Sequence, residues 1–210
     1  MMLFDNDTQI DENIINSLLS FCDLGGFAPG ALLYNFVDDS KTKQLKCIKD
    51  ILKQNNIQYV LETGTESGMF SYFARCVNPD IKVVTFGMNE GHNPTADKRS
   101  EVCTGFLNKT FGNYIEYVEG DSRITLTNFT PKTEIQFAWV DGGHTRDICM
   151  SDLNNCKRLR IPHICVDDYN MIPEVRETVE IFLNNNPEYQ KQFVTDEERG
   201  ICYMKLIHVN

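Results

Sequence analysis

Acidic residues follow closely after three hydrophobic runs in this chain, and carboxylates in such places can do chemistry. Asp121 follows the first run, Asp141 follows the second, and the pair Asp167 and Asp168 follows the third. If these runs are strands of one parallel sheet, the acids gather at its carboxyl edge, where open α/β sheets bind ligands. Carboxylates gathered there can bind a hard divalent cation or accept a proton from a substrate.

A fourth polar segment, residues 62–68 with the sequence Glu-Thr-Gly-Thr-Glu-Ser-Gly, follows another hydrophobic run. Its two glycines, Gly64 and Gly68, let the backbone approach a ligand closely. The spacing differs from the G-x-G-x-x-G pattern of dinucleotide-binding folds. Glu62 would repel a pyrophosphate, but it can accept a hydrogen bond from an ammonium group. The segment therefore favours a cationic ligand that carries an amino-acid group over NAD.

The elements that must position these residues alternate between strand and helix. Strands are expected at five places, which are residues 57–61, 81–86, 114–118, 135–140 and 163–166. Helices are expected over residues 11–21, 40–55, 68–79, 95–109 and 145–158, and onward from 173. A polar turn at 195–200, between the runs 190–194 and 201–207, predicts a hairpin. We therefore expect an α/β fold with a doubly wound, mostly parallel, seven-stranded Rossmann-like sheet, which a C-terminal antiparallel hairpin closes with a reversed edge.

Composition narrows the class of protein. The chain has 210 residues, 41% of them hydrophobic, and no apolar run long enough for a membrane span. Its acidic start lacks the pattern of a signal peptide, so we expect a cytoplasmic protein without a membrane partner. A net charge of −10 disfavours nucleic acid as a partner. The eight cysteines include no C-x-x-C pair, which favours reduced, buried thiols over a zinc site.

Over residues 59–168 the chain resembles the class I S-adenosylmethionine-dependent methyltransferases. The segment 62–68 carries this resemblance to the superfamily. The stretches Trp-Val-Asp-Gly-Gly-His at 139–144 and Val-Asp-Asp-Tyr at 166–169 resemble a subgroup, the small-molecule O-methyltransferases related to the macrocin and novobiocin enzymes. The resemblance implies a fold of the kind described above, with residues 1–56 as an N-terminal helical segment that covers cofactor and acceptor and residues 57–210 as the methyltransferase domain.

The resemblance also implies which residues hold the cofactor. Glu62 and Gly64 would bind its methionine end, and three further residues of the same turn, Thr65, Ser67 and Gly68, would close over it.

The adenosine part of the cofactor would meet a second set of residues. Asp121 would accept the adenine amino group, and Ser122 would lie at the edge of the adenine ring. The acid that usually binds the ribose falls on Gly87 in this chain, so we expect Asn89 or Glu90 to take its place.

In the related enzymes, acids at the ends of the fourth and fifth strands bind a divalent cation. Asp141, Asp167 and Asp168 occupy those positions, and their hard oxygen ligands suit Mg²⁺, which would lower the pKa of an acceptor hydroxyl. The alternative is that one of the paired aspartates caps the following helix.

Asp141 is expected to contact the cofactor as well and to act in catalysis together with His144. For His144 two interpretations stay open. It is either a general base near the methyl group, since imidazole titrates close to neutral pH, or a residue at a helix start that holds Asp141.

These assignments predict an enzyme that moves a methyl group from S-adenosylmethionine to a hydroxyl of a small molecule, such as a sugar or secondary metabolite, with help from Mg²⁺. The alternatives are a methyltransferase-fold binding protein without catalysis, which the missing ribose acid favours, and an NAD-dependent oxidoreductase. Methylation of nitrogen is a third alternative, but the chain lacks an N-P-P-Y-type motif. A homodimer is the default expectation for its assembly.

Overall fold

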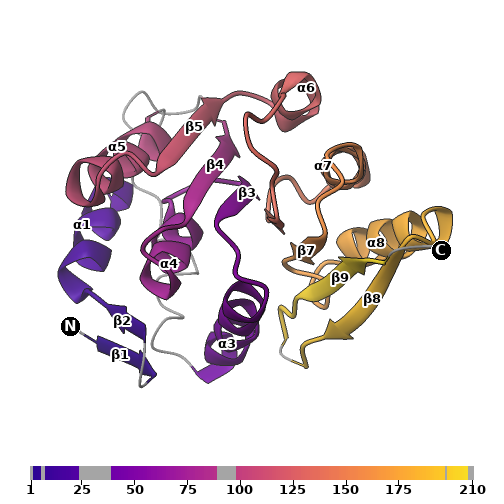
Figure 1. The fold of residues 1–210 in the computed structure, drawn as a ribbon, viewed down its shortest axis with the longest axis horizontal. Coiled ribbons are helices and arrows are strands. Elements are labelled where there is room, and N and C mark those ends of the chain that lie inside the picture. The colour runs from indigo at the N-terminus through magenta and orange to yellow at the C-terminus, as the bar shows by residue number, and fades with distance from the viewer. Residues whose placement is uncertain (1, 6–7, 24–38, 89–97, 197, 208–210) are drawn as a thin grey trace.

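The structure is a computed structural model and describes residues 2–5, 8–23, 39–88, 98–196 and 198–207. A seven-stranded sheet crosses the molecule in the order β5-β4-β3-β6-β7-β9-β8 (Figure 1). Its strands are β3 (Tyr59–Thr63), β4 (Lys82–Gly87), β5 (Ile115–Glu119), β6 (Phe137–Val140), β7 (His163–Val166), β8 (Tyr189–Val194) and β9 (Cys202–Leu206). The five strands from β3 to β7 pair in parallel. The predicted α/β class and the mostly parallel seven-stranded sheet are confirmed.

The reversal at the C-terminal side differs in one detail from the expectation. Strand β9 is antiparallel both to β7 and to β8, so it lies between two strands that run the other way to it. The edge strand β8 therefore points in the same direction as β7. The second strand of the hairpin, β9, lies next to the parallel strand β7. The sequence predicted a reversed strand at the edge of the sheet, whereas the reversed strand β9 lies one position inside that edge.

Helices cover both faces of the sheet (Figure 1). One face packs under α1 (Glu12–Asp23), α3 (Asp39–Gln54), α4 (Met69–Val77) and α5 (Arg99–Phe111). The other face packs under α6 (Ser122–Asn128), α7 (Arg146–Arg158) and α8 (Pro173–Asn185). Neighbouring strand residues alternate between the two cores. Phe137 and Trp139 enter the first, and Ala138 and Val140 enter the second. This period of two is the reason that hydrophobic runs, rather than alternating ones, mark the strands.

The N-terminal segment contains a feature that its sequence did not predict. Strands β1 (Met2–Asp5) and β2 (Thr8–Ile10) form a small antiparallel sheet before α1. Ile10 is buried in the first core, and the backbone N–H of Asp11 donates to the hydroxyl of Tyr72 on α4 at 2.7 Å. The described part of this segment is therefore packed onto the sheet domain.

None of the helices in the described ranges is long and apolar enough to span a membrane.

Candidate functional site

Glu62 lies at the carboxyl end of β3, the middle one of the five parallel strands, as the second-to-last residue of the strand rather than after it as expected. Its side chain is only 2% exposed, and its Oε2 accepts a hydrogen bond from the hydroxyl of Ser71 at 2.7 Å. Burial raises the pKa of Glu62 to about 8, and hydrogen bonds from Ser71 and Thr85 offset part of that rise. Within the described ranges no cation pairs with this carboxylate. A buried carboxylate with only neutral donors is a suitable partner for a cationic group of a ligand.

The glycine-bearing turn after Glu62 is packed against the protein itself. Gly64 has a φ of +91°, and a Cβ placed on it would lie 1.9 Å from the backbone oxygen of Asp141. The backbone at Gly64 therefore lies closely against the neighbouring β6–α7 loop. Thr65 is buried, and its hydroxyl shares a hydrogen bond of 2.7 Å with that of Thr85.

The rest of the turn leads directly into helix α4. Gly68 is the N-cap of α4 with a φ of +68°, and its N–H donates to the carbonyl of Thr65 at 2.6 Å. Ser67 is buried beside it. The structure thus brings the predicted cofactor-turn residues Gly64, Thr65, Ser67 and Gly68 together at the end of β3.

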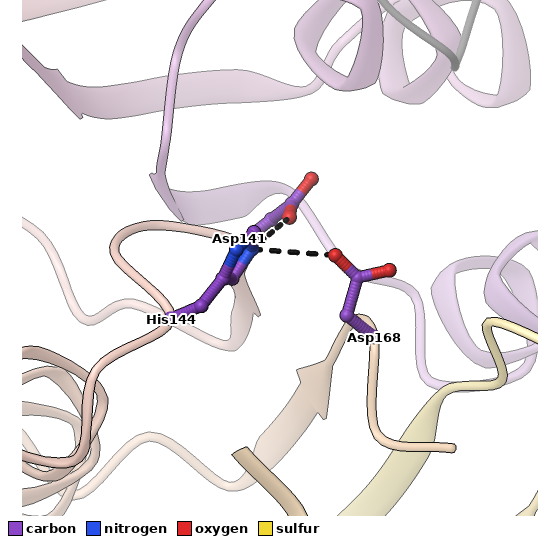
Figure 2. A group of neighbouring side chains, drawn as sticks. All are labelled: Asp141, His144 and Asp168. Carbon is purple, nitrogen blue, oxygen red and sulfur yellow. Dashed lines mark ion pairs between the residues drawn. The ribbon is translucent and has the colours of Figure 1, made fainter. Parts of the chain in front are cut away.

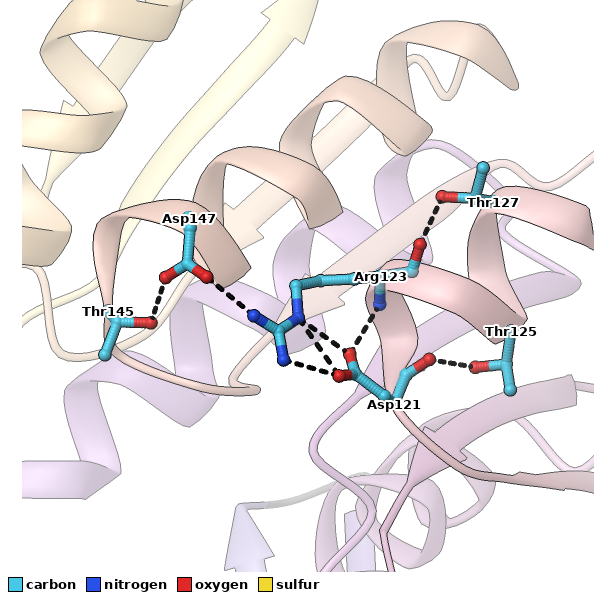
Figure 3. Close-up of polar contacts among 6 residues, drawn as sticks. All are labelled: Asp121, Arg123, Thr125, Thr127, Thr145 and Asp147. Carbon is cyan, nitrogen blue, oxygen red and sulfur yellow. Dashed lines mark hydrogen bonds and ion pairs between the residues drawn. The ribbon is translucent and has the colours of Figure 1, made fainter.

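Asp121 lies between β5 and α6, where its carboxylate is already engaged (Figure 3). It caps α6 by accepting the N–H of Arg123 at 2.9 Å, and the Arg123 guanidinium donates to both of its oxygens at 2.6–3.0 Å. These hydrogen bonds lower the pKa of Asp121. Arg123 also reaches Asp147 on α7 at 2.6 Å. An adenine amino group at Asp121 would therefore have to share this carboxylate with Arg123. Ser122 begins α6 next to it.

Asp141, His144 and Asp168 come together where β6 and β7 end (Figure 2). The His144 Nε2 lies 3.3 Å from Asp168 Oδ2 and 3.9 Å from Asp141 Oδ1. Interaction with Asp141 and then the charge of Asp168 raise the pKa of His144, although partial burial works against them. The Asp168 carboxylate is fully buried, whereas about half of the His144 side chain is exposed. This arrangement is typical of an imidazole that carboxylates orient toward a ligand.

Arg199 completes this group and was not identified from the sequence. It lies in the turn between β8 and β9, and its Nε and Nη2 donate to the two oxygens of Asp168 at 2.6 and 2.9 Å. Such a two-point pair between guanidinium and carboxylate is strong and geometrically specific. The sequence placed Arg199 in a polar turn, and only the packing of that turn on the end of β7 reveals its partner.

The remaining predicted residues that the structure describes lie outside the group of Asp141, His144 and Asp168. Asp167 is buried at the end of β7 but is not part of the group that Asp141, His144 and Asp168 form. Gly87 ends β4, and a Cβ on it would lie 2.7 Å from the hydroxyl of Thr65, which leaves little room for an acid there. Asn89 and Glu90, the predicted substitutes for that acid, lie outside the described residues.

A magnesium ion does not fit the Asp141, His144 and Asp168 group as it stands. Their ligand atoms are close enough, within 4.8 Å of one another. However, Mg²⁺ prefers six oxygen ligands at about 2.1 Å, and both oxygens of Asp168 already accept hydrogen bonds from Arg199. A divalent ion here would have to displace a fixed guanidinium or lie beside its positive charge.

Asp152 is a second buried acid that the sequence did not single out. It lies in α7 with 0% exposure, close to Gly142 and Thr63. Burial raises its pKa to about 6, and the nearby hydroxyls of Ser122 and Thr63 offset part of that rise. Within the described ranges neither oxygen of Asp152 has a hydrogen-bond partner.

The part of the chain that carries these residues matches a family of known proteins. A family model described as a methyltransferase domain matches residues 61–169, which include the ends of β3, β5, β6 and β7. No curated protein sequence matches the chain significantly.

Several solved structures share the fold at low sequence identity. The O-methyltransferase TomG from Streptomyces achromogenes, solved with SAM, is 18% identical, with a TM-score of 0.69 over 95% of this chain and 92% of its own. The Bacillus cereus O-methyltransferase solved with SAH is 14% identical, with a TM-score of 0.67 over 94% and 92%. The SAH-bound methyltransferase PaMTH1 from Podospora anserina is 12% identical, with a TM-score of 0.58 over 94% and 97%.

Proposed function

Because the chain belongs to the methyltransferase domain family, we propose that it transfers a methyl group from S-adenosylmethionine to a hydroxyl of a small-molecule acceptor. The structures of TomG and of the Bacillus cereus enzyme are named as O-methyltransferases in complex with SAM or SAH, which supports this choice of donor and acceptor atom.

The observation that carries the proposal is the state of Glu62. Its carboxylate is buried at the carboxyl end of the central strand, has a pKa of about 8, and contacts neutral hydroxyls. The α-ammonium group of S-adenosylmethionine would supply the missing positive charge and return the carboxylate to its ionised form. A phosphate-bearing cofactor such as NAD would instead add negative charge near this acid.

The chain's own residues then have to accept the proton of the acceptor hydroxyl. When bound, S-adenosylmethionine supplies an electrophilic methyl group on a positively charged sulfur. The acceptor oxygen forms a new bond to that carbon as the carbon–sulfur bond breaks, so the hydroxyl proton must move to a base.

We assign His144 as that base. A proton on its Nε2 is held by Asp168 at 3.3 Å, which leaves the lone pair of Nδ1 to accept the hydroxyl proton. The carboxylates of Asp141 and Asp168 raise the pKa of His144 and thereby stabilise the imidazolium that results. Mg²⁺ has no part in this reaction, because Arg199 donates to both oxygens of Asp168.

Calorimetric titration with S-adenosylhomocysteine tests the proposal. We expect binding whose affinity rises with pH toward 8, by up to about tenfold per pH unit, because Glu62 must ionise to pair with the ammonium group. The Glu62→Gln variant should bind weakly at every pH and lose this dependence. Glu116→Gln, a change of an exposed acid on β5, is the matched control.

Two outcomes would contradict the proposal. One is wild-type protein that binds NAD⁺ but not S-adenosylhomocysteine, and the other is unchanged affinity in the Glu62→Gln variant.

Four further predictions from the sequence remain part of the proposal. They are the cover formed over cofactor and acceptor by residues 1–56, the cofactor contacts at Asp121 and Ser122, a homodimeric assembly and a cytoplasmic location.

A further inference from the structure

The pair between Asp168 and Arg199 is built into the fold. Asp168 lies in the turn after β7 with a φ of +56° and a fully buried side chain. The turn after β8 is hydrogen-bonded to it, since the N–H of Tyr169 donates to Gly200 O and that of Asn170 to Arg199 O, both at 3.0 Å. The backbone on both sides of the pair is therefore fixed, and the Arg199 side chain is only 27% exposed.

The positive charge that faces the Asp168 carboxylate comes from Arg199. A buried carboxylate needs a positive partner or a set of good donors, because desolvation penalises its ionised form. Arg199 provides both, with two N–H donors at 2.6 and 2.9 Å from the Asp168 oxygens. Its charge also acts on the nearby carboxylates of Asp141 and Asp167. These are the three acids that the sequence assigned to a divalent cation.

We propose that Arg199 takes the place of that divalent cation, so that this site positions its base with a protein guanidinium and binds no divalent metal. The inference rests on the proposed function. Arg199 is a positioning residue, because it acts through Asp168, whose Oδ2 lies 3.3 Å from His144 Nε2. With Arg199 bonded to it, Asp168 holds the imidazole in one orientation.

Titration with Mn²⁺, followed by the paramagnetic resonance signal of the free ion, tests this inference directly. At Mn²⁺ concentrations up to about 1 mM, we expect the wild-type protein to show no binding that depends on Asp168. The Arg199→Met variant keeps the length of the side chain but frees both oxygens of Asp168, so it should bind Mn²⁺ at least about tenfold more tightly. That gain should disappear when Asp168→Asn is added.

Arg146→Met is the matched control. It removes an equal charge from an exposed pair with Glu177, so it should leave Mn²⁺ binding unchanged. Circular dichroism identifies a variant that fails to fold.

Two results would overturn the inference. The first is tight Mn²⁺ binding by wild-type protein that Asp168→Asn abolishes, a comparison that needs no Arg199 variant. The second is a folded Arg199→Met variant with no gain in affinity. Binding of S-adenosylhomocysteine, measured on the same samples, tests the proposed function separately. Failure of the prediction about the metal can therefore be told apart from failure of the proposed function.

Discussion

Three buried acids near the carboxyl edge of the sheet meet the cost of burial in different ways. Glu62 has a pKa of about 8 and is held by the Ser71 hydroxyl, which suits a residue that awaits a positive ligand. Asp168 is paired with Arg199, whose guanidinium donates to both of its oxygens. Asp152 has neither a cation nor a well-aligned donor within the described ranges, so its ionised form costs the folded protein free energy.

This contrast predicts that Asp152→Asn stabilises the protein at neutral and higher pH. The pKa of Asp152 is raised to about 6 in the folded state, so the wild-type protein loses stability as the pH rises from the unfolded value of 3.8 to 6. An amide has no charge to desolvate. The difference in unfolding free energy between the variant and the wild type should therefore grow by about 2 kcal/mol from pH 4 to pH 8.

Urea unfolding at several pH values measures this difference. Asp50→Asn, a change of an exposed acid on α3, provides the control. A difference between Asp152→Asn and wild type that is independent of pH would show that Asp152 is not protonated in the folded state.

At the scale of elements, the β3–α4 turn and the β6–α7 loop hold one another in place. Gly64 makes this possible, because a Cβ there would lie 1.9 Å from Asp141 O. The N–H of Asp141 in turn donates to the carbonyl of Thr63 at 3.0 Å. The β3–α4 turn and the loop that carries His144 are therefore packed against each other.

We expect Gly64→Ala to destabilise the protein by about 2–5 kcal/mol, because both the positive φ and the backbone clash oppose the added methyl group. Gly112→Ala is the matched control. Gly112 has a φ of +82° but has nothing within 4 Å of its Cβ position, so only the backbone term of about 1 kcal/mol applies. Thermal unfolding of both variants measures the difference. Equal losses would mean that the turn and the loop are not held against each other.

The sequence was sufficient for the strands and helices of the seven-stranded sheet domain, but not for the β1–β2 pair or for the pairings between distant turns. The strand at 163–166 was predicted with its observed bounds, and Glu62 was assigned to the correct strand end although β3 extends two residues further and includes it. Arg199 could not be assigned because its partner Asp168 is 31 residues away and nothing local distinguishes it from a solvated turn arginine. Asp152 is buried because of the way in which α7 packs on the neighbouring loops. A polar residue in a helix gives no sign of such burial in the sequence.

At the scale of the molecule, the sheet order brings the carboxyl ends of five parallel strands to one edge (Figure 1). Two separate cores fill the space on the two faces of the sheet. The first core joins segments far apart in the chain. Leu18 of α1 belongs to it together with Leu107 of α5 and Trp139 of β6. The N-terminal helix thus shares its core with the strand next to the candidate site.

This shared core predicts that the described part of the N-terminal segment and the sheet unfold together. Leu18 is 0% exposed, so Leu18→Ala should cost about 2–5 kcal/mol. Leu153→Ala, at an equally buried position in the second core, should cost a similar amount. In urea, far-ultraviolet circular dichroism and the fluorescence of Trp139, the single tryptophan, should shift together in both variants, because one cooperative transition governs both signals. An early loss of helix in Leu18→Ala, with the Trp139 transition unmoved, would show instead that α1 is a separate unit resting on the sheet domain.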